Sequence, residues 1–139
     1  MEISERDLLD DSHGVLPVLF ELRALGVGLS LDDYGTGFTS LIRLRELPFT
    51  ELKIERSFVT GIATVPIDQA IVRSTVDLAR SLGMVTVAEG VEAQDVLDQL
   101  VDLKCERAQG YLFGKAVPLD VTLAQLRPEV PISLGLAAN

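Results

Sequence analysis

The sequence predicts an α/β protein built around a parallel sheet. Short apolar segments with strand character alternate with amphipathic segments of helical spacing, at intervals of roughly 25 to 35 residues, and this rhythm is typical of βαβ units. The chain has 139 residues, of which 47% are hydrophobic, so it can bury the core of one domain. Neither a close sequence repeat nor a low-complexity linker divides it. We therefore expect a single domain over residues 1–139.

The first part of the chain supplies two strands and two helices. Residues 2–5 are compatible with the end of a strand or with a frayed terminus. Apolar residues at helical spacing predict a helix over 13–25, which a glycine ends. An apolar run predicts a strand over 27–31, and a short helix over 41–47 is ended by a proline. Residues 51–55 alternate between polar and apolar, as expected of a second strand.

The second part of the chain continues the alternation. A proline opens and a glycine closes a longer helix over 66–82, which carries an apolar stripe. Residues 84–88 are predicted to form a third strand, and 91–103 an amphipathic helix. Residues 107–113 are expected to be a fourth strand or an extended segment. The chain then continues with a predicted helix over 118–126 and a loosely ordered tail from about residue 127.

The composition excludes several classes of function. The net charge of −9 and the pI of about 4.5 argue against DNA or RNA as a partner, because these polyanions select basic surfaces. A small anionic ligand that metal ions bring in remains compatible with this charge. Cys105 is the single cysteine, so no internal disulfide forms, and we expect it to be a small buried hydrophobe. No signal peptide or membrane-length apolar run is visible, so a cytoplasmic location is expected.

Polar side chains recur where the predicted strands end. They are Asp32 and Asp33 after the first strand, Lys53 and Glu55 in the second, Glu89 after the third, and Gln109 in the fourth. The carboxyl ends of parallel strands meet at one edge of a sheet, where α/β proteins place their chemistry. On their own, the two aspartates fit an Asx turn as well as a metal site. Their recurrence on four strands favours one shared site.

The chemistry of this residue set favours metal-assisted phosphoryl hydrolysis. Carboxylates and an amide are ligands for hard cations such as Mg²⁺, Mn²⁺ or Ca²⁺. The single histidine, His13, lies near a predicted helix start and receives no catalytic role, so no histidine-based triad can form. Two oxygen-ligated metals can activate water for attack at phosphorus, with Lys53 beside them. A response-regulator receiver also pairs acids with a lysine, but here Lys53 comes one strand too soon.

Five segments together resemble the EAL family, the phosphodiesterases that hydrolyse cyclic di-GMP to linear pGpG. Residues 31–41, LDDYGTGFTSL, look like the family's DDFGTG motif. Residues 52–59, LKIERSFV, are similar to its LKIDRSFV segment, and residues 87–92, VAEGVE, to its AEGVE motif. Residues 108–113 contain the QGY motif, and residues 2–5 look like the upstream ExTE segment. The resemblance implies a TIM-like (β/α) barrel.

The resemblance also implies a role for individual residues. Glu2, Asp32 and Glu89 would be metal-site residues, and Asp33 would bridge to or bind a second metal, with Mg²⁺ or Mn²⁺ as the cation. Lys53 would orient the attacking water or the phosphate, so the implied catalytic residues are Lys53, Glu89 and Asp33. The remaining implied roles are substrate binding for Gln109 and Glu92, an outer metal shell for Glu55, and, for Glu5, pinning of the loop 34–40.

Departures from the family pattern change the expectation. The Glu-Ala-Leu segment is not found, nor are the family's first metal-binding glutamate, its asparagine ligand and a substrate-holding arginine segment, and Glu55 replaces the usual aspartate. We therefore expect an incomplete barrel of about four or five parallel strands, whose open edges favour self-association or a partner that completes the barrel. The predicted function is a metal-dependent cyclic di-GMP phosphodiesterase of impaired activity. The alternatives are an inactive EAL-derived module that binds a nucleotide or a protein, and a remnant without function.

Overall fold

The structure is a computed structural model of the whole chain, and it describes residues 1–5, 14–35 and 41–125. One parallel sheet organises it, with the strand order β1-β2-β3-β4-β5. The strands are β1 (Glu2–Ser4), β2 (Ser30–Tyr34), β3 (Glu51–Ile54), β4 (Val85–Ala88) and β5 (Arg107–Ala108). Each strand therefore pairs with the strand before it in the sequence, and all pairs are parallel. The expected sheet of four or five parallel strands is confirmed.

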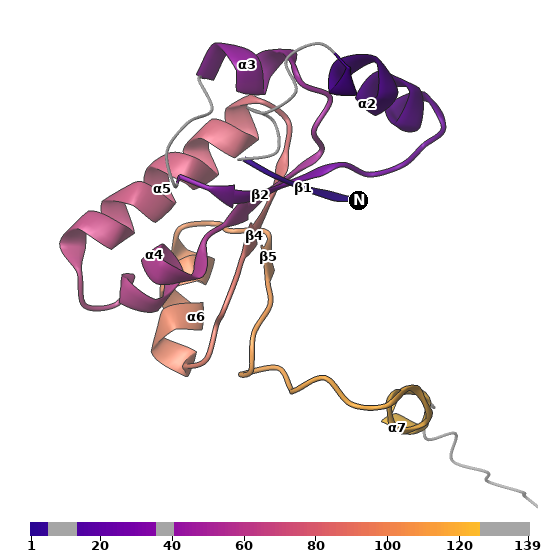
Figure 1. Cartoon of the computed structure of the whole chain (residues 1–139). Helices are drawn as coiled ribbons and strands as arrows, with labels where there is room; N and C mark the ends of the chain where they lie inside the picture. Colours follow the sequence, from indigo (N-terminus) through magenta and orange to yellow (C-terminus); the bar gives the residue numbers. More distant parts are fainter. Residues whose placement is uncertain (6–13, 36–40, 126–139) are drawn as a thin grey trace, which may run out of the picture.

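Helices connect the strands and gather on one side of the sheet (Figure 1). The described helices are α2 (Val15–Ala24), α3 (Leu41–Glu46), α4 (Arg56–Gly61), α5 (Pro66–Ser81), α6 (Gln94–Asp102) and α7 (Leu119–Gln125). The short helix α4 was not predicted, whereas the other five agree with the sequence apart from their ends. α7 lies apart from the sheet and the other helices (Figure 1). None of these helices combines the length and apolar character needed to cross a bilayer.

The hydrophobic core fills the space between the sheet and the helices. Alternate strand residues point into it, including Leu31, Leu52, Ile54 and Ala88, all of which are buried. Cys105, which was expected to be buried, is only half-buried, and it packs against the part of the core beneath α6. The same alternation turns the intervening residues to the opposite face of the sheet, which no described helix covers.

The strand β2 differs from the prediction for residues 27–31. Pairing with β1 and β3 begins at Ser30 and continues through Tyr34, so both aspartates lie inside the strand. The register shifts between Leu31 and Tyr34, and Asp33 has a φ of 57°. This left-handed residue is a local bulge, which re-aims side chains that strict alternation would send to opposite faces.

The fourth predicted strand is shorter than expected. Of the predicted residues 107–113, only Arg107 and Ala108 pair with β4. β1 and β5 each have one strand neighbour in the described part of the chain, so the barrel is not closed. His13, loop residues 36–40 and the tail from 127 lie outside the described residues.

Candidate metal and active site

Lys53 is the centre of the candidate site, on the uncovered face of the sheet. Its side chain is only 6% exposed, and it extends from the buried strand β3. The Nζ atom lies 2.6 Å from Glu89 Oε1, 3.0 Å from Glu2 Oε1 and 3.2 Å from Asp32 Oδ1. One buried ammonium thus joins carboxylates from β1, β2 and the end of β4.

The carboxylates keep Lys53 charged. Burial by itself would lower the pKa of the lysine, but hydrogen bonds to Glu89, Glu2 and Asp32 outweigh it and raise the pKa above its ordinary value. The ammonium is therefore protonated at neutral pH. A protonated lysine has three donors and no acceptor. Lys53 can hold carboxylates or phosphate oxygens in place, but it cannot accept a proton.

Three acids meet closely enough to share a cation. Asp32, Asp33 and Glu89 each offer a carboxylate oxygen, and these oxygens lie within 4.8 Å of one another. Oxygen ligands of one Mg²⁺ or Ca²⁺ ion lie about 2.0 to 2.6 Å from the metal, so they can be up to about 5 Å apart. Asp33 follows Asp32 directly in the chain, so in a regular strand their side chains would point to opposite faces. The bulge at Asp33 allows both carboxylates to approach Glu89. The donor set and spacing therefore fit a hard divalent cation.

Gln109 completes the row of polar groups on the side of β5. Its Nε2 atom donates a hydrogen bond of 2.7 Å to Glu89 Oε1, the same oxygen that Lys53 contacts. Its backbone N–H donates to the carbonyl oxygen of Ala88 at 2.9 Å, which fixes the residue beside the end of β4. The structure thus brings together the predicted residues Glu2, Asp32, Asp33, Lys53, Glu89 and Gln109.

Glu5 lies just behind this row. It is 3% exposed, and its backbone N–H donates to the carbonyl oxygen of Asp32 at 3.2 Å. Burial, and then the charge of Glu5, raise the pKa of Tyr34, so the acid lies near the first residue of the loop that it was predicted to pin. The remainder of that loop, 36–40, lies outside the described residues.

Two further predicted residues make different contacts. Glu55 directly precedes α4 and accepts a hydrogen bond from the Ser57 hydroxyl, and it is outside the acidic group formed by Asp32, Asp33 and Glu89. Glu92 forms an ion pair of 2.7 Å with Arg56, which sequence reasoning did not single out. Arg56 is the first residue of α4, two positions after the end of β3, and a charge so close to the strand end was the signal that could have identified it.

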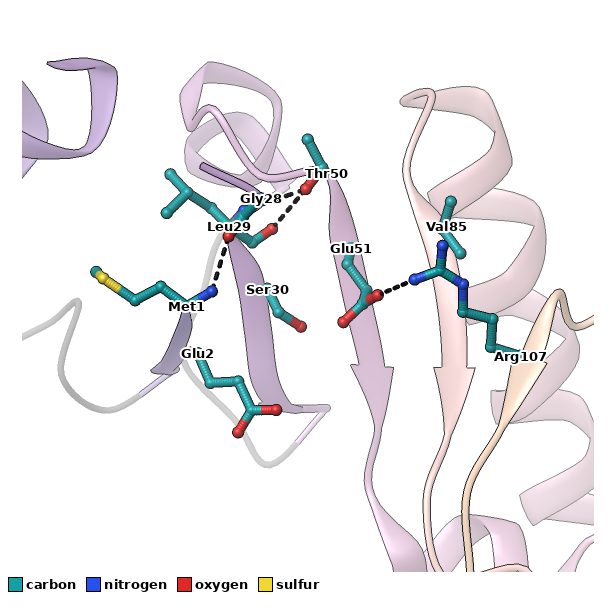
Figure 2. A pocket seen from close by; sticks show the side chains of 9 residues that line it. All are labelled: Met1, Glu2, Gly28, Leu29, Ser30, Thr50, Glu51, Val85 and Arg107. Atoms are coloured by element: carbon teal, nitrogen blue, oxygen red, sulfur yellow. Dashed lines mark hydrogen bonds and ion pairs between the residues drawn. The ribbon is translucent and has the colours of Figure 1, made fainter. Parts of the chain in front are cut away.

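A cavity of about 380 Å³ opens on the same face, nearer the amino ends of the strands. Among the residues that line it, Glu51 of β3 and Arg107 of β5 are joined by an ion pair, with 2.7 Å between their charged atoms (Figure 2). The buried hydroxyl of Ser30 also lines the cavity, and it has no hydrogen-bond partner among the described residues. The uncovered face of the sheet thus carries polar groups near both ends of the strands, with Val85 of β4 among them.

The fold and the acidic row together define a class of protein, the α/β proteins of barrel type with an acidic site at the carboxyl ends of parallel strands. Comparison with known proteins gives the family, since the EAL domain model matches residues 1–116. The chain belongs to the EAL domain family.

Relatives with known names support this assignment. The chain is 43% identical to the cyclic di-GMP phosphodiesterase RocR of Pseudomonas aeruginosa over 117 residues, covering 84% of this chain and 30% of RocR. The solved PaMucR phosphodiesterase in complex with c-di-GMP superposes with a TM-score of 0.81 at 41% identity, covering 87% of this chain and 49% of that one. For the EAL domain of Mycobacterium smegmatis DcpA, the TM-score is 0.82 at 38% identity, covering 90% and 56%.

These comparisons also confirm the predicted fold class. The structural neighbours are TIM-barrel domains of EAL type, and this chain forms five parallel strands of such a barrel without closing it. The chain spans less than a third of the length of the curated relatives it matches.

Proposed function

We propose that this chain carries the carboxyl-terminal, metal-binding part of a cyclic di-GMP phosphodiesterase site. The observation that carries the proposal is the convergence of Asp32, Asp33 and Glu89 beside the buried ammonium of Lys53. The names of the relatives give the substrate, because RocR is called a cyclic di-GMP phosphodiesterase and PaMucR was solved with c-di-GMP. The proposed product is linear pGpG.

The charge of the site explains why a cation is needed. The carboxylates of Glu2, Asp32, Asp33 and Glu89 face one ammonium, so negative charge is in excess. A phosphodiester that approached these acids alone would be repelled. Mg²⁺ or Mn²⁺ held by Asp32, Asp33 and Glu89, with Glu2 alongside, would offset most of that negative charge and supply an activated water.

The chain's own residues would then orient the reaction. Lys53 stays protonated, so we assign it to holding the carboxylates and neutralising a phosphate oxygen, while a carboxylate accepts the proton of the attacking water. Gln109 fixes the Glu89 carboxylate from the other side. Substrate contacts by Gln109 and Glu92, an outer role for Glu55, and pinning of the 34–40 loop by Glu5 complete the proposal.

The uncovered sheet face sets a condition on this function. Both edge strands and the polar face need a covering partner, so we propose that a second copy or another chain completes the barrel. Light scattering tests self-association, and a monodisperse particle of 15.1 kDa at high concentration would contradict it. The proposed compartment is the cytoplasm, which suits a chain with one cysteine and no disulfide.

A second candidate is an EAL-derived module that binds cyclic di-GMP or a protein without turnover. The open sheet favours it, because the described strands do not close a barrel around the acidic site. Binding of c-di-GMP with no pGpG formed would support this module over the enzyme.

The deciding experiment measures pGpG formation from cyclic di-GMP with Mn²⁺ or Mg²⁺. Asp32→Asn should abolish turnover, because it removes a charged ligand at the centre of the cluster. Asp102→Asn is the matched control, since Asp102 is an exposed acid at the end of α6. Turnover that survives Asp32→Asn, or wild-type protein that forms no pGpG, would contradict the proposed enzyme.

A further inference from the structure

The loop between β4 and α6, residues 89–93, carries Glu89, the acid of the site that contacts both Lys53 and Gln109. We call it the Glu89 loop. Its first residue, Glu89, meets both Lys53 and Gln109 through one carboxylate oxygen. Since ligand geometry tolerates little error, whatever holds this loop also sets the position of that carboxylate.

On the side of β5, backbone contacts hold the loop. The N–H of Val91 donates to the carbonyl oxygen of Gln109 at 3.0 Å, and the N–H of Leu112 donates to the carbonyl oxygen of Val91 at 3.0 Å. A Cβ at Gly110 would overlap the backbone of Val91, so the two main chains lie directly against each other. Backbone contacts thus hold this side of the loop at Val91, in addition to the side-chain contact of Gln109 with Glu89.

On the side of β3, the contact is made largely by one side chain. The N–H of Glu89 donates to the carbonyl oxygen of Ile54 at 3.2 Å. The next residues of the loop, Gly90 and Glu92, are contacted by the side chain of Arg56. Its aliphatic stem lies where a Cβ of Gly90 would be, and its Nη2 atom reaches Glu92 Oε1 at 2.7 Å. Gly90 has a φ of +69°, so both the backbone conformation and the arginine stem require glycine there.

We propose that Arg56 is a positioning residue for Glu89. Its stem packs on Gly90 and its guanidinium holds Glu92, so it clamps the Glu89 loop against β3 from outside the acidic cluster. The Arg56 and Glu92 side chains are 61% and 47% exposed, and an ion pair this exposed adds little to global stability. The clamp acts on the position of one loop. Its link to metal binding rests on the proposed function, whereas the clamp itself does not.

Amide hydrogen exchange of the purified chain tests the clamp directly. Arg56→Ala should raise the exchange rates of the Glu89 and Val91 amides by about tenfold or more, because the loop opens locally. The amide of Ser30, which bonds to Met1 on the far side of the sheet, should be unchanged. Arg80→Ala is the matched control, because Arg80 is also half exposed and paired with an acid, Asp77, on α5.

Titration with Mn²⁺ tests the consequence for the site. Arg56→Ala should weaken Mn²⁺ binding by about ten- to a hundredfold, as removal of an outer-shell partner does. Arg56→Lys keeps a charge and a long stem, so it should recover most of the affinity. The proposal is supported if Mn²⁺ affinity falls in Arg56→Ala, recovers in Arg56→Lys and stays at the wild-type value in Arg80→Ala.

The two measurements separate the clamp from the proposed function. If the wild-type chain binds no Mn²⁺, the proposed metal site fails, and faster exchange at Glu89 and Val91 in Arg56→Ala still supports the clamp. If these two amides exchange in Arg56→Ala as they do in Arg80→Ala, the clamp is overturned whatever the metal does.

Discussion

Two ionic groups lie on the same face of the sheet, only two residues apart along β3. Lys53 is 6% exposed and faces Glu2, Asp32 and Glu89. Glu51, one row nearer the amino ends, is paired with Arg107, whose side chain is 62% exposed. The first group has one cation for several acids, whereas the second is balanced.

The difference shows which group is suited to function. A balanced pair whose arginine is exposed satisfies its own charges and needs nothing further. An excess of acids around a buried ammonium is unfavourable by itself, and it becomes favourable when a cation or a cationic ligand arrives. The imbalance of charge therefore separates the candidate site from the ion pair beside it.

The strongest test of this comparison is Lys53→Met. The substitution leaves three carboxylates around a buried position without their cation, and we expect it to lower the free energy of unfolding by about 3 kcal/mol. Urea unfolding in EDTA measures the loss. Mn²⁺ should restore more stability to the variant than to the wild type, because the metal replaces the missing charge. Equal stabilisation of both by Mn²⁺ would contradict the metal site.

A pair of glycine substitutions tests the packing of the Glu89 loop. Gly110→Ala places a Cβ in the backbone of Val91 and should lower the free energy of unfolding by about 2 to 3 kcal/mol. Gly83→Ala is the control, because Gly83 has a φ of +72° and open space around it, so it should lose only about 1 kcal/mol. Thermal unfolding compares the two. A larger loss in Gly83→Ala would mean that the close approach at Gly110 is absent in solution.

Alkaline pH should weaken the Lys53 cluster. The folded pKa of Lys53 is raised above its ordinary value of 10.5, so the stabilisation is fully present below pH 10.5 and is lost as the pH rises towards the folded pKa. The raised pKa of Tyr34 acts in the same direction. Urea unfolding followed from pH 7 to well above pH 10.5 should therefore show a steeper alkaline loss in wild type than in Lys53→Met. If the unfolding free energies of the two proteins fell in parallel with pH, the alkaline loss would not come from Lys53.

The smallest effect is expected from Arg107→Met. An exposed pair contributes at most about 1 kcal/mol, so the variant should unfold close to the wild type. Because Arg107 lies in the row next to the site and not in it, Mn²⁺ affinity should also change little. Isothermal titration and urea unfolding on one preparation check both statements, and a loss as large as that of Lys53→Met would erase the distinction between the two groups.

The sequence predicted the sheet and the gathering of polar groups because both follow from short-range patterns. Alternating strands and helices define the layers, and the carboxyl ends of parallel strands must meet. That rule alone brings Asp32, Lys53, Glu89 and Gln109 to one edge, as the structure shows.

Other features depend on contacts that no local pattern contains. The pairing of Arg56 with Glu92 joins residues 36 positions apart, and it requires β3 and β4 to be neighbours. The length of β5 depends on Gly110 lying against Val91, after which the chain bonds to the Glu89 loop and leaves the sheet. The bulge at Asp33 was equally hidden, because aspartate is compatible with a turn and with a left-handed strand residue.

The order of the strands has a consequence for folding during synthesis. Because β1 to β5 follow one another in space as they do in the sequence, each strand finds its neighbour already formed as the chain leaves the ribosome. Loop closures between neighbours are short, so the sheet can assemble progressively. Among the described strands, β5 comes last in the sequence, and it brings Gln109 to Glu89 after the other strands of the site have formed.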